Sequence, residues 1–128
     1  MRVLLDTHAF LWWILGSPKL SELARETIAE ESNELLFSVV SGWEISIKVG
    51  IGKLELPDTP KDFVTEQILL NDLKVLPVDL NHALRVYELP DHHQDPFDRL
   101  LMSQALEEGV PVLTADPFIT RYPVETIW

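Results

Sequence analysis

Short apolar runs alternate along the chain with longer segments whose apolar residues recur at helical spacing. The short runs predict buried strands at residues 3–5, 35–39, 74–78 and 110–114, with a last edge strand in 124–128. The longer segments predict helices at residues 8–15, 21–31, 41–50, 59–70, 80–89 and 95–109, and a helical turn from 116. Strands that alternate with amphipathic helices are typical of an α/β fold with a mostly parallel sheet. The pattern does not determine the order of the strands.

Several predicted helices begin with a residue whose side chain can accept a hydrogen bond from the first helical turn. Ser21 has this position before the second helix. In Thr59-Pro60 and Asp95-Pro96 a proline follows the capping residue, where its missing N–H would have had no helical partner. These starts fix where three of the helices should begin.

The composition is that of one globular domain, which we expect to span residues 1–128: 46% of the residues are hydrophobic and 24% are charged. The chain contains no cysteine, which excludes a disulfide framework and a thiolate metal site. The apolar run at residues 9–15 is too short to span a membrane, and the first residues lack the layout of a signal peptide. We therefore expect a cytoplasmic protein without membrane association.

The acidic residues change this picture, because four of them should reach the same edge of the sheet. Asp6 and Asp116 each follow a predicted strand, and Glu44 lies in the first turn of the helix after another strand. Asp98 opens a helix that runs antiparallel to the strand after it, so the start of that helix lies at the same edge. Open α/β sheets place their sites at the carboxyl ends of the strands.

Each of these carboxylates also has a simpler explanation at a helix start. Ser41 and Glu44 match a capping box, and Asp116 precedes a proline as a capping residue would. Capping contributes about 1 kcal/mol per helix. It does not explain why all four residues are anionic, because serine, threonine or asparagine would cap as well.

Gathered carboxylates repel one another unless their pKa values shift or a cation lies between them. Oxygen ligands without a thiolate suit Mg²⁺ or Mn²⁺, which can activate a water and neutralise charge on a phosphodiester. The formal net charge of −11 excludes a general basic face for nucleic acid, so cations would have to supply positive charge locally. The number of ions and the carboxylate that deprotonates the water stay open.

Three blocks of the sequence, in this order and spacing, resemble the PIN-domain family and in particular its ribonuclease toxins of the VapC type: LLDTHAFLWW, SVVSGWEISIKVGIGKL and HHQDPFDRLLMSQALEEGVPVLTAD. The resemblance covers essentially the whole chain and implies a three-layer α/β/α sandwich around a mostly parallel sheet. It implies a metal-dependent endoribonuclease that is the toxin of a toxin–antitoxin pair. It also implies RNA as the substrate, a VapB-type antitoxin as the partner, and a homodimer.

The resemblance assigns residues to the site as well. The family's acidic positions, which would be catalytic and hold the metal, correspond to Asp6, Glu44, Asp98 and Asp116. The supporting positions around them correspond to Thr7, His93, Asp95, Arg99 and Thr114. Among these, Asp95 is expected to be a helix cap first, Arg99 to pair with a carboxylate, and His93 to be either a ligand or a loop residue.

A few further residues bear on the site or the core. Trp43 is expected to line the site beside Glu44, and Trp12 to pack in the core or in an interface. Lys48 and Lys53 could contact an RNA backbone, but a solvated face is the favoured interpretation. A helix surface is expected for His82.

Two alternatives from other classes remain. In a phosphoacceptor domain, Asp6 and Asp116 would surround Mg²⁺, and such a domain needs a lysine after the last apolar strand. That segment reads VLTADPF, which counts against this alternative. A catalytically idle relative that only binds its partner is the second alternative, and the intact acidic set argues against it.

Overall fold

The computed structural model describes residues 1–92 and 94–128, so the prediction for His93 lies outside the described residues. The strands are Arg2–Leu5 (β1), Glu34–Ser38 (β2), Lys74–Leu76 (β3), Val112–Leu113 (β4) and Thr126–Ile127 (β5). The α-helices are Thr7–Ile14 (α1), Glu22–Ala29 (α2), Val39–Gly50 (α3), Pro60–Leu70 (α4), Leu80–Arg85 (α5) and Pro96–Glu108 (α6). Two short 3₁₀ segments follow α5 and β4, at Val86–Glu88 (η1) and Ile119–Arg121 (η2). In the described part of the chain, no helix has the length and apolar character needed to cross a membrane.

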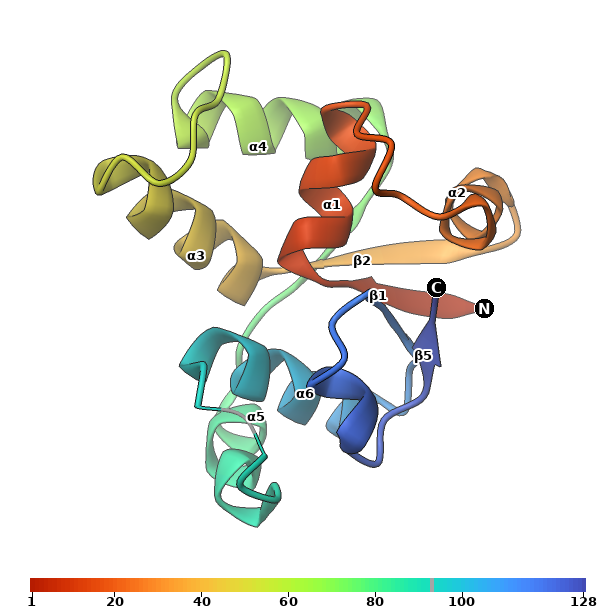
Figure 1. Ribbon diagram of the computed structural model, residues 1–128, viewed down its shortest axis with the longest axis vertical. Coiled ribbons are helices and arrows are strands. Elements are labelled where there is room, and N and C mark those ends of the chain that lie inside the picture. Colours follow the sequence, from red (N-terminus) through yellow and green to blue (C-terminus); the bar gives the residue numbers. More distant parts are fainter. Residues whose placement is uncertain (93) are drawn as a thin grey trace.

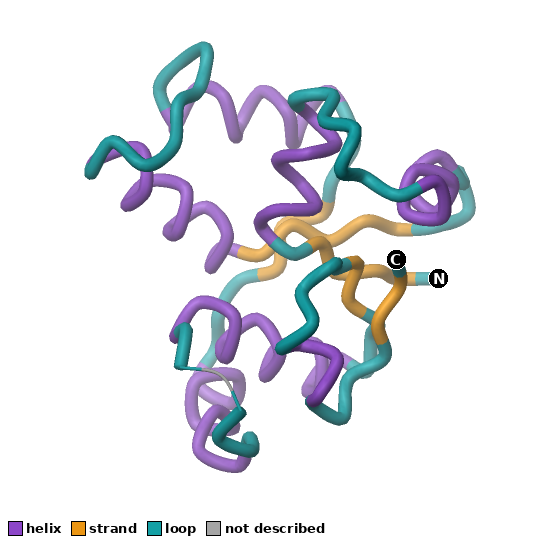
Figure 2. Tube along the Cα trace, viewed as in Figure 1, coloured by secondary structure: helices purple, strands orange, loops and turns teal. Residues whose placement is uncertain are grey.

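The strands form one sheet in the order β3-β2-β1-β4-β5, and every neighbouring pair is parallel. In Figure 2 the strands lie in the middle of the molecule, between the helices. The central strand is β1, in which Leu4 is in register with Leu36 on one side and with Val112 on the other. The predicted α/β class and parallel sheet are confirmed. Parallel neighbours need crossovers, and the helices supply them.

Helices cover both faces of the sheet, because successive residues of a strand point to opposite faces. Val3 of β1 packs in one core cluster with Phe10 of α1, whereas Leu4 packs in another with Leu101 of α6. In Figure 1, α1, α2 and α4 lie on one side of the sheet, and α5 and α6 lie on the other. The three-layer α/β/α sandwich is therefore confirmed.

The predicted helix starts at Ser21, Thr59 and Asp95 are confirmed. Each of these side chains accepts a hydrogen bond from a backbone N–H of the first turn, and Pro60 and Pro96 occupy the first helical positions of α4 and α6. α6 also ends as predicted, at a left-handed glycine.

The start of α3 differs from the prediction. Ser38, the last residue of β2, caps this helix by accepting the Val40 N–H at 3.0 Å. The strand therefore runs into the helix without a loop, and Ser41 and Glu44 lie inside the helix. The predicted capping box of Ser41 and Glu44 is wrong, and Glu44 lies in the second turn of α3 rather than the first.

His82 is buried, with only 2% of its surface exposed, so its predicted place on a helix surface is wrong. Its Nδ1 accepts the backbone N–H of Asp79 at 3.1 Å, which completes a capping box at the start of α5. Its Nε2 lies 3.3 Å from a carboxylate oxygen of Glu108 on α6. The histidine is buried because α5 packs on α6, a contact between segments far apart in the sequence.

Candidate active site

The carboxyl ends of β1, β2 and β4 lie at one edge of the sheet, because these strands are parallel neighbours. Helices α1 and α3 begin at this edge, directly after β1 and β2 (Figure 1). Helix α6 precedes β4 and contacts α3 across the sheet edge. Glu44 and Asp98 lie on α3 and α6, and Asp6 and Asp116 lie in the connections after β1 and β4, so their common edge follows from the topology.

Asp6 is held firmly at the junction of β1 and β4. Its Oδ1 accepts the Ala9 N–H at 2.6 Å and so caps α1, while its Oδ2 accepts a short hydrogen bond from the Thr114 hydroxyl. Burial raises the pKa of Asp6, and nearby Asp116 adds to the rise, although the bonds from Thr114 and Ala9 act in the opposite direction. A nearby cation would remove this penalty on the charged form.

Thr114 links Asp116 to Asp6 through hydrogen bonds to both residues. The Thr114 hydroxyl accepts the Asp116 N–H at 3.0 Å while it donates to Asp6. One oxygen of Asp116 accepts the Phe118 N–H at 2.9 Å, which closes the turn before η2. Asp6 and Asp116 line one pocket of about 310 Å³ together with His8, Trp12, Ala115 and Pro117.

Glu44 is almost fully buried in α3, with 2% of its surface exposed. Its Oε2 forms an ion pair with Lys48, one helical turn further on. Its Oε1 is buried without a hydrogen-bond partner among the described residues. A buried acceptor that lacks a partner is destabilising, typically by about 1–3 kcal/mol, so this oxygen is suited to receive a ligand.

Lys48 connects Glu44 with the start of α6. Burial alone would lower the pKa of Lys48, but the hydrogen bond and the charge of Glu44 outweigh it and raise the pKa above its ordinary value. The charges of Asp95 and Asp98 add to this rise, which places them within electrostatic reach of the Lys48 ammonium. The favoured prediction of a merely solvated Lys48 is therefore wrong.

The start of α6 presents Asp98 from a well-capped turn. Asp95 accepts the N–H groups of Phe97 at 2.9 Å and Asp98 at 3.2 Å, so its predicted role as a cap is confirmed. Arg99 donates to the carbonyl oxygens of Pro90 at 2.9 Å and Val86 at 3.2 Å, and so links α6 to these two residues.

Aromatic residues flank these polar groups. Trp43 lies next to Glu44 in α3, is 56% exposed, and packs edge-on against Phe97 with ring centroids 4.9 Å apart. On the other side of the edge, Trp12 stacks with His8 at 5.8 Å and contacts the ring of Trp128 at 5.7 Å. Trp43 therefore packs on the start of α6, and its place in the wall of the site stays a prediction.

The four carboxylates do not converge in a ready-made cluster. Within residues 1–92 and 94–128, no group of three or more acidic or histidine side chains lies close enough to hold a metal ion. Asp6 and Asp116 share one pocket, whereas Glu44 pairs with Lys48 near Asp98. The donor chemistry fits a hard divalent cation, because the donors are oxygens and one of them is the orphaned Glu44 Oε1. The ligand set stays a prediction.

Two contacts near the site escaped the sequence analysis. Ser41 accepts a hydrogen bond from the Thr7 hydroxyl at 2.9 Å, and so ties the first turn of α3 to the start of α1. The spacing of four residues between Glu44 and Lys48 is the usual signal for a helical ion pair and was available in the sequence. The Thr7–Ser41 bond has no local signal, because it joins two separate helices.

The fold and the acidic edge define an α/β domain of the PIN type. The family model of the PIN domain matches residues 3–125, and the chain belongs to this family.

Individual relatives agree with this membership. Over 98% of both chains, the sequence is 28% identical to ribonuclease VapC22 of Mycobacterium tuberculosis (strain ATCC 25618 / H37Rv). A chain of the Rickettsia felis VapBC2 complex, bound to a DNA fragment from its promoter, superposes with a TM-score of 0.73, 16% identity and coverage of 98% of this chain and 97% of that one. A chain of VapBC-1 from nontypeable Haemophilus influenzae gives a TM-score of 0.63, 18% identity and coverage of 98% and 96%. These solved structures show a similarity in fold.

Proposed function

We propose that this chain is a Mg²⁺- or Mn²⁺-dependent endoribonuclease, built as one domain over residues 1–128, and that it is the toxin of a toxin–antitoxin pair. The observation that carries the proposal is Glu44, a carboxylate buried at the sheet edge with one oxygen lacking a partner among the described residues. Asp6 and Asp116 share a pocket at the same edge, and a relative of matching length is a ribonuclease.

In this proposal, water hydrolyses a phosphodiester of RNA, so that one P–O bond forms and another breaks. A divalent cation, when bound, supplies positive charge to the phosphate oxygens and makes a water more acidic. The predicted ligands are Asp6, Glu44, Asp98 and Asp116. Thr114 holds the Asp6 carboxylate in one orientation. The Thr7–Ser41 bond sets α3, and with it Glu44, against α1.

The proposed partner is a VapB-type antitoxin, and the chain is proposed to form a homodimer. Support comes from two chains of similar fold, which belong to the VapBC2 and VapBC-1 structures. Exposed apolar side chains are available for such contacts, among them Leu69 on α4 and Leu84 on α5.

The test combines cleavage with metal binding. The wild-type protein should cleave RNA in Mn²⁺ but not in EDTA, and Glu44→Gln should lose this cleavage. Bound Mn²⁺ should stabilise the wild-type fold by about 2.7 kcal/mol at roughly 100 times its Kd, and the rise in Tm should shrink in Glu44→Gln.

Glu66→Gln is the matched control, because it makes the same change at an exposed position of α4. It should behave as the wild-type protein in both measurements. A Glu44→Gln protein that cleaves RNA and gains Tm in Mn²⁺ as the wild type does would refute the role of Glu44.

A further inference from the structure

The end of α3 places two lysines side by side. The Gly52 N–H bonds to the Val49 carbonyl at 3.1 Å, and the Lys53 N–H bonds to the Lys48 carbonyl at 2.9 Å. Together with the left-handed Gly52, which has a φ of 76°, these two bonds make a Schellman motif. The two residues joined by the bond that spans five positions commonly form an apolar contact in this motif, but here they are Lys48 and Lys53.

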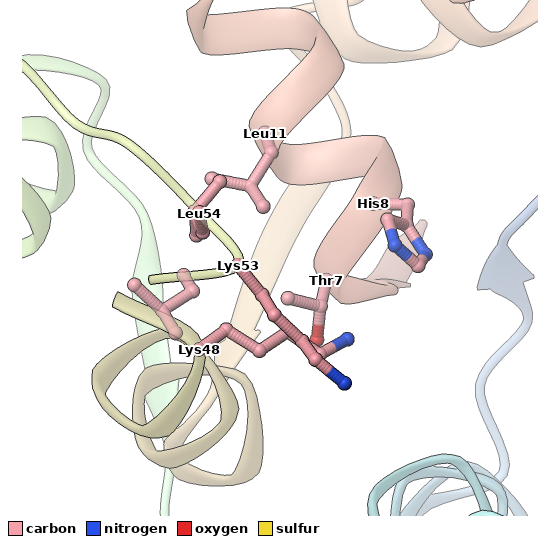
Figure 3. A pocket seen from close by; sticks show the side chains of 7 residues that line it. Thr7, His8, Leu11, Lys48, Lys53 and Leu54 are labelled. Atoms are coloured by element: carbon pink, nitrogen blue, oxygen red, sulfur yellow. The ribbon is translucent and has the colours of Figure 1, made fainter. Parts of the chain in front are cut away.

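Both lysines reach into a pocket of about 250 Å³ between α1 and the end of α3. In Figure 3 both lysine side chains extend towards the end of the pocket where Thr7 lies. Leu11 and Leu54 form the apolar wall of the pocket. His8 lines this pocket and also the pocket that contains Asp6, so the two pockets are neighbours.

Within the described part of the chain, the two lysines at this turn have one carboxylate partner between them, so one positive charge is left over. Glu44 pairs with Lys48, but no hydrogen bond or ion pair of the described residues engages the Lys53 ammonium. Two like charges held together by the backbone repel one another unless an anion lies between them. This is notable in a chain with a net charge of −11, where positive charge is scarce.

We propose that the pocket formed by Lys48, Lys53 and Thr7 is a subsite for a backbone phosphate of the RNA. The inference rests on the proposed function and assigns Lys53 as a positioning residue. Lysine binds phosphate as a point charge without a required orientation, which suits a polymer of any sequence. Because His8 borders both pockets, an RNA strand that lies over Asp6 and Asp116 would continue into this subsite.

The first measurement is the affinity for a short fluorescein-labelled single-stranded RNA in EDTA, followed by fluorescence anisotropy over a range of salt concentrations. Lys53→Gln should weaken binding roughly three- to tenfold at low salt, and the slope of log affinity against log salt should fall by about 0.7. Gly52→Ala keeps both charges but strains the left-handed turn, so it should weaken binding in the same direction.

Lys61→Gln is the matched control, since Lys61 is an exposed lysine in the first turn of α4. It should leave both the affinity and the slope unchanged. In Mn²⁺, Lys53→Gln should raise the KM for RNA cleavage and leave kcat nearly unchanged.

The outcomes separate this inference from the proposed function. If the wild-type protein cleaves RNA and Lys53→Gln matches it in affinity, salt slope and KM, the subsite is refuted and the nuclease stands. If the wild-type protein neither binds nor cleaves RNA, both proposals fall. If the protein binds poly-glutamate as tightly as RNA, and Lys53→Gln weakens both equally, the pocket recognises an acidic polypeptide and the phosphate assignment is overturned.

Discussion

Helices α4 and α6 begin with the same local chemistry and have different surroundings. Each start consists of a capping residue, a proline and an aspartate at the third helical position: Thr59-Pro60-Lys61-Asp62 and Asp95-Pro96-Phe97-Asp98. The Thr59 hydroxyl accepts the Asp62 N–H at 3.2 Å, and Asp95 accepts the Asp98 N–H at the same distance of 3.2 Å. In both helix starts, the cap therefore accepts the N–H of the aspartate at the third helical position.

The difference lies in what the rest of the fold brings to each aspartate. Asp62 is exposed, whereas Asp98 is partly buried and lies in the field of Lys48, the ion-pair partner of Glu44. The capping residue is also anionic in α6 and neutral in α4. An aspartate near a helix start is therefore explained by the helix dipole alone, and a role in a site has to be argued from the neighbouring helix.

The largest effect that tests this comparison is on RNA cleavage. Asp98→Asn should lower cleavage in Mn²⁺ more than about 100-fold, because a ligand should matter more than the groups that merely orient ligands. Asp62→Asn should leave cleavage unchanged. Each substitution should lower the free energy of unfolding by less than about 1 kcal/mol, since each removes one favourable charge from a helix start.

Cleavage rates and urea unfolding of both variants check this expectation. Equal cleavage by Asp98→Asn and Asp62→Asn would show that Asp98, like Asp62, stabilises a helix start and has no role in the site. A large loss of stability confined to Asp98→Asn would mean that the loss of cleavage reflects the fold.

Much of the fold was predictable, because helix starts are local. The caps at Thr59, Asp95 and Ser21 follow from the residue types and their distance from the next apolar positions. The predicted start of α3 lies too late because Val39 and Val40 are β-branched and favour a continuation of the strand. Ser38 is the cap because β2 extends to it, and its hydroxyl also bonds with the Gln104 side chain of α6.

The site was predictable only as a set of residues at one sheet edge. The order of parallel strands and the contact of α3 with α6 join segments far apart in the sequence, and they decide that Glu44 is buried beside Lys48. The burial of His82 against Glu108 has the same origin. The approach of Lys53 to Lys48 is local, and its signal in the sequence is Gly52, which allows the left-handed turn after α3.

A smaller effect distinguishes the two caps. Asp95→Ala and Thr59→Ala should each lower the free energy of unfolding by about 1 kcal/mol, because each removes a side-chain acceptor from a helix start. Asp95→Ser should recover most of this stability, since serine can accept the same hydrogen bonds without the charge. Urea unfolding in EDTA measures all three variants.

If Asp95→Ser were as unstable as Asp95→Ala, the negative charge of Asp95 near Lys48 would be its main contribution to stability. Asp95 would then stabilise α6 by its charge, whereas Thr59 stabilises α4 by a hydrogen bond. Cleavage by Asp95→Ser should also fall much less than cleavage by Asp98→Asn. An equal fall would make Asp95 part of the site.

The start of α1 extends the comparison to a cap that is both anionic and buried. Because burial raises the pKa of Asp6 above its ordinary value of 3.8, the folded state holds the proton more tightly than the unfolded state. Below that ordinary value the carboxyl is protonated in both states and has no effect on stability. Stability is then lost as the pH rises towards the folded-state pKa.

Asp6→Asn should remove this loss, because asparagine can still accept the Ala9 N–H but does not ionise. In EDTA, the free energy of unfolding of Asp6→Asn should gain on the wild type as the pH rises from about 4 to about 8, measured by urea unfolding. Asp62→Asn, which neutralises an exposed carboxylate, should show no such gain. Added Mn²⁺ should reverse the order at neutral pH, because only the wild-type protein keeps the Asp6 carboxylate as a ligand. If the free energies of unfolding of Asp6→Asn and the wild type differ by the same amount across this range, ionisation of Asp6 does not destabilise the fold. The start of α1 would then resemble the start of α4.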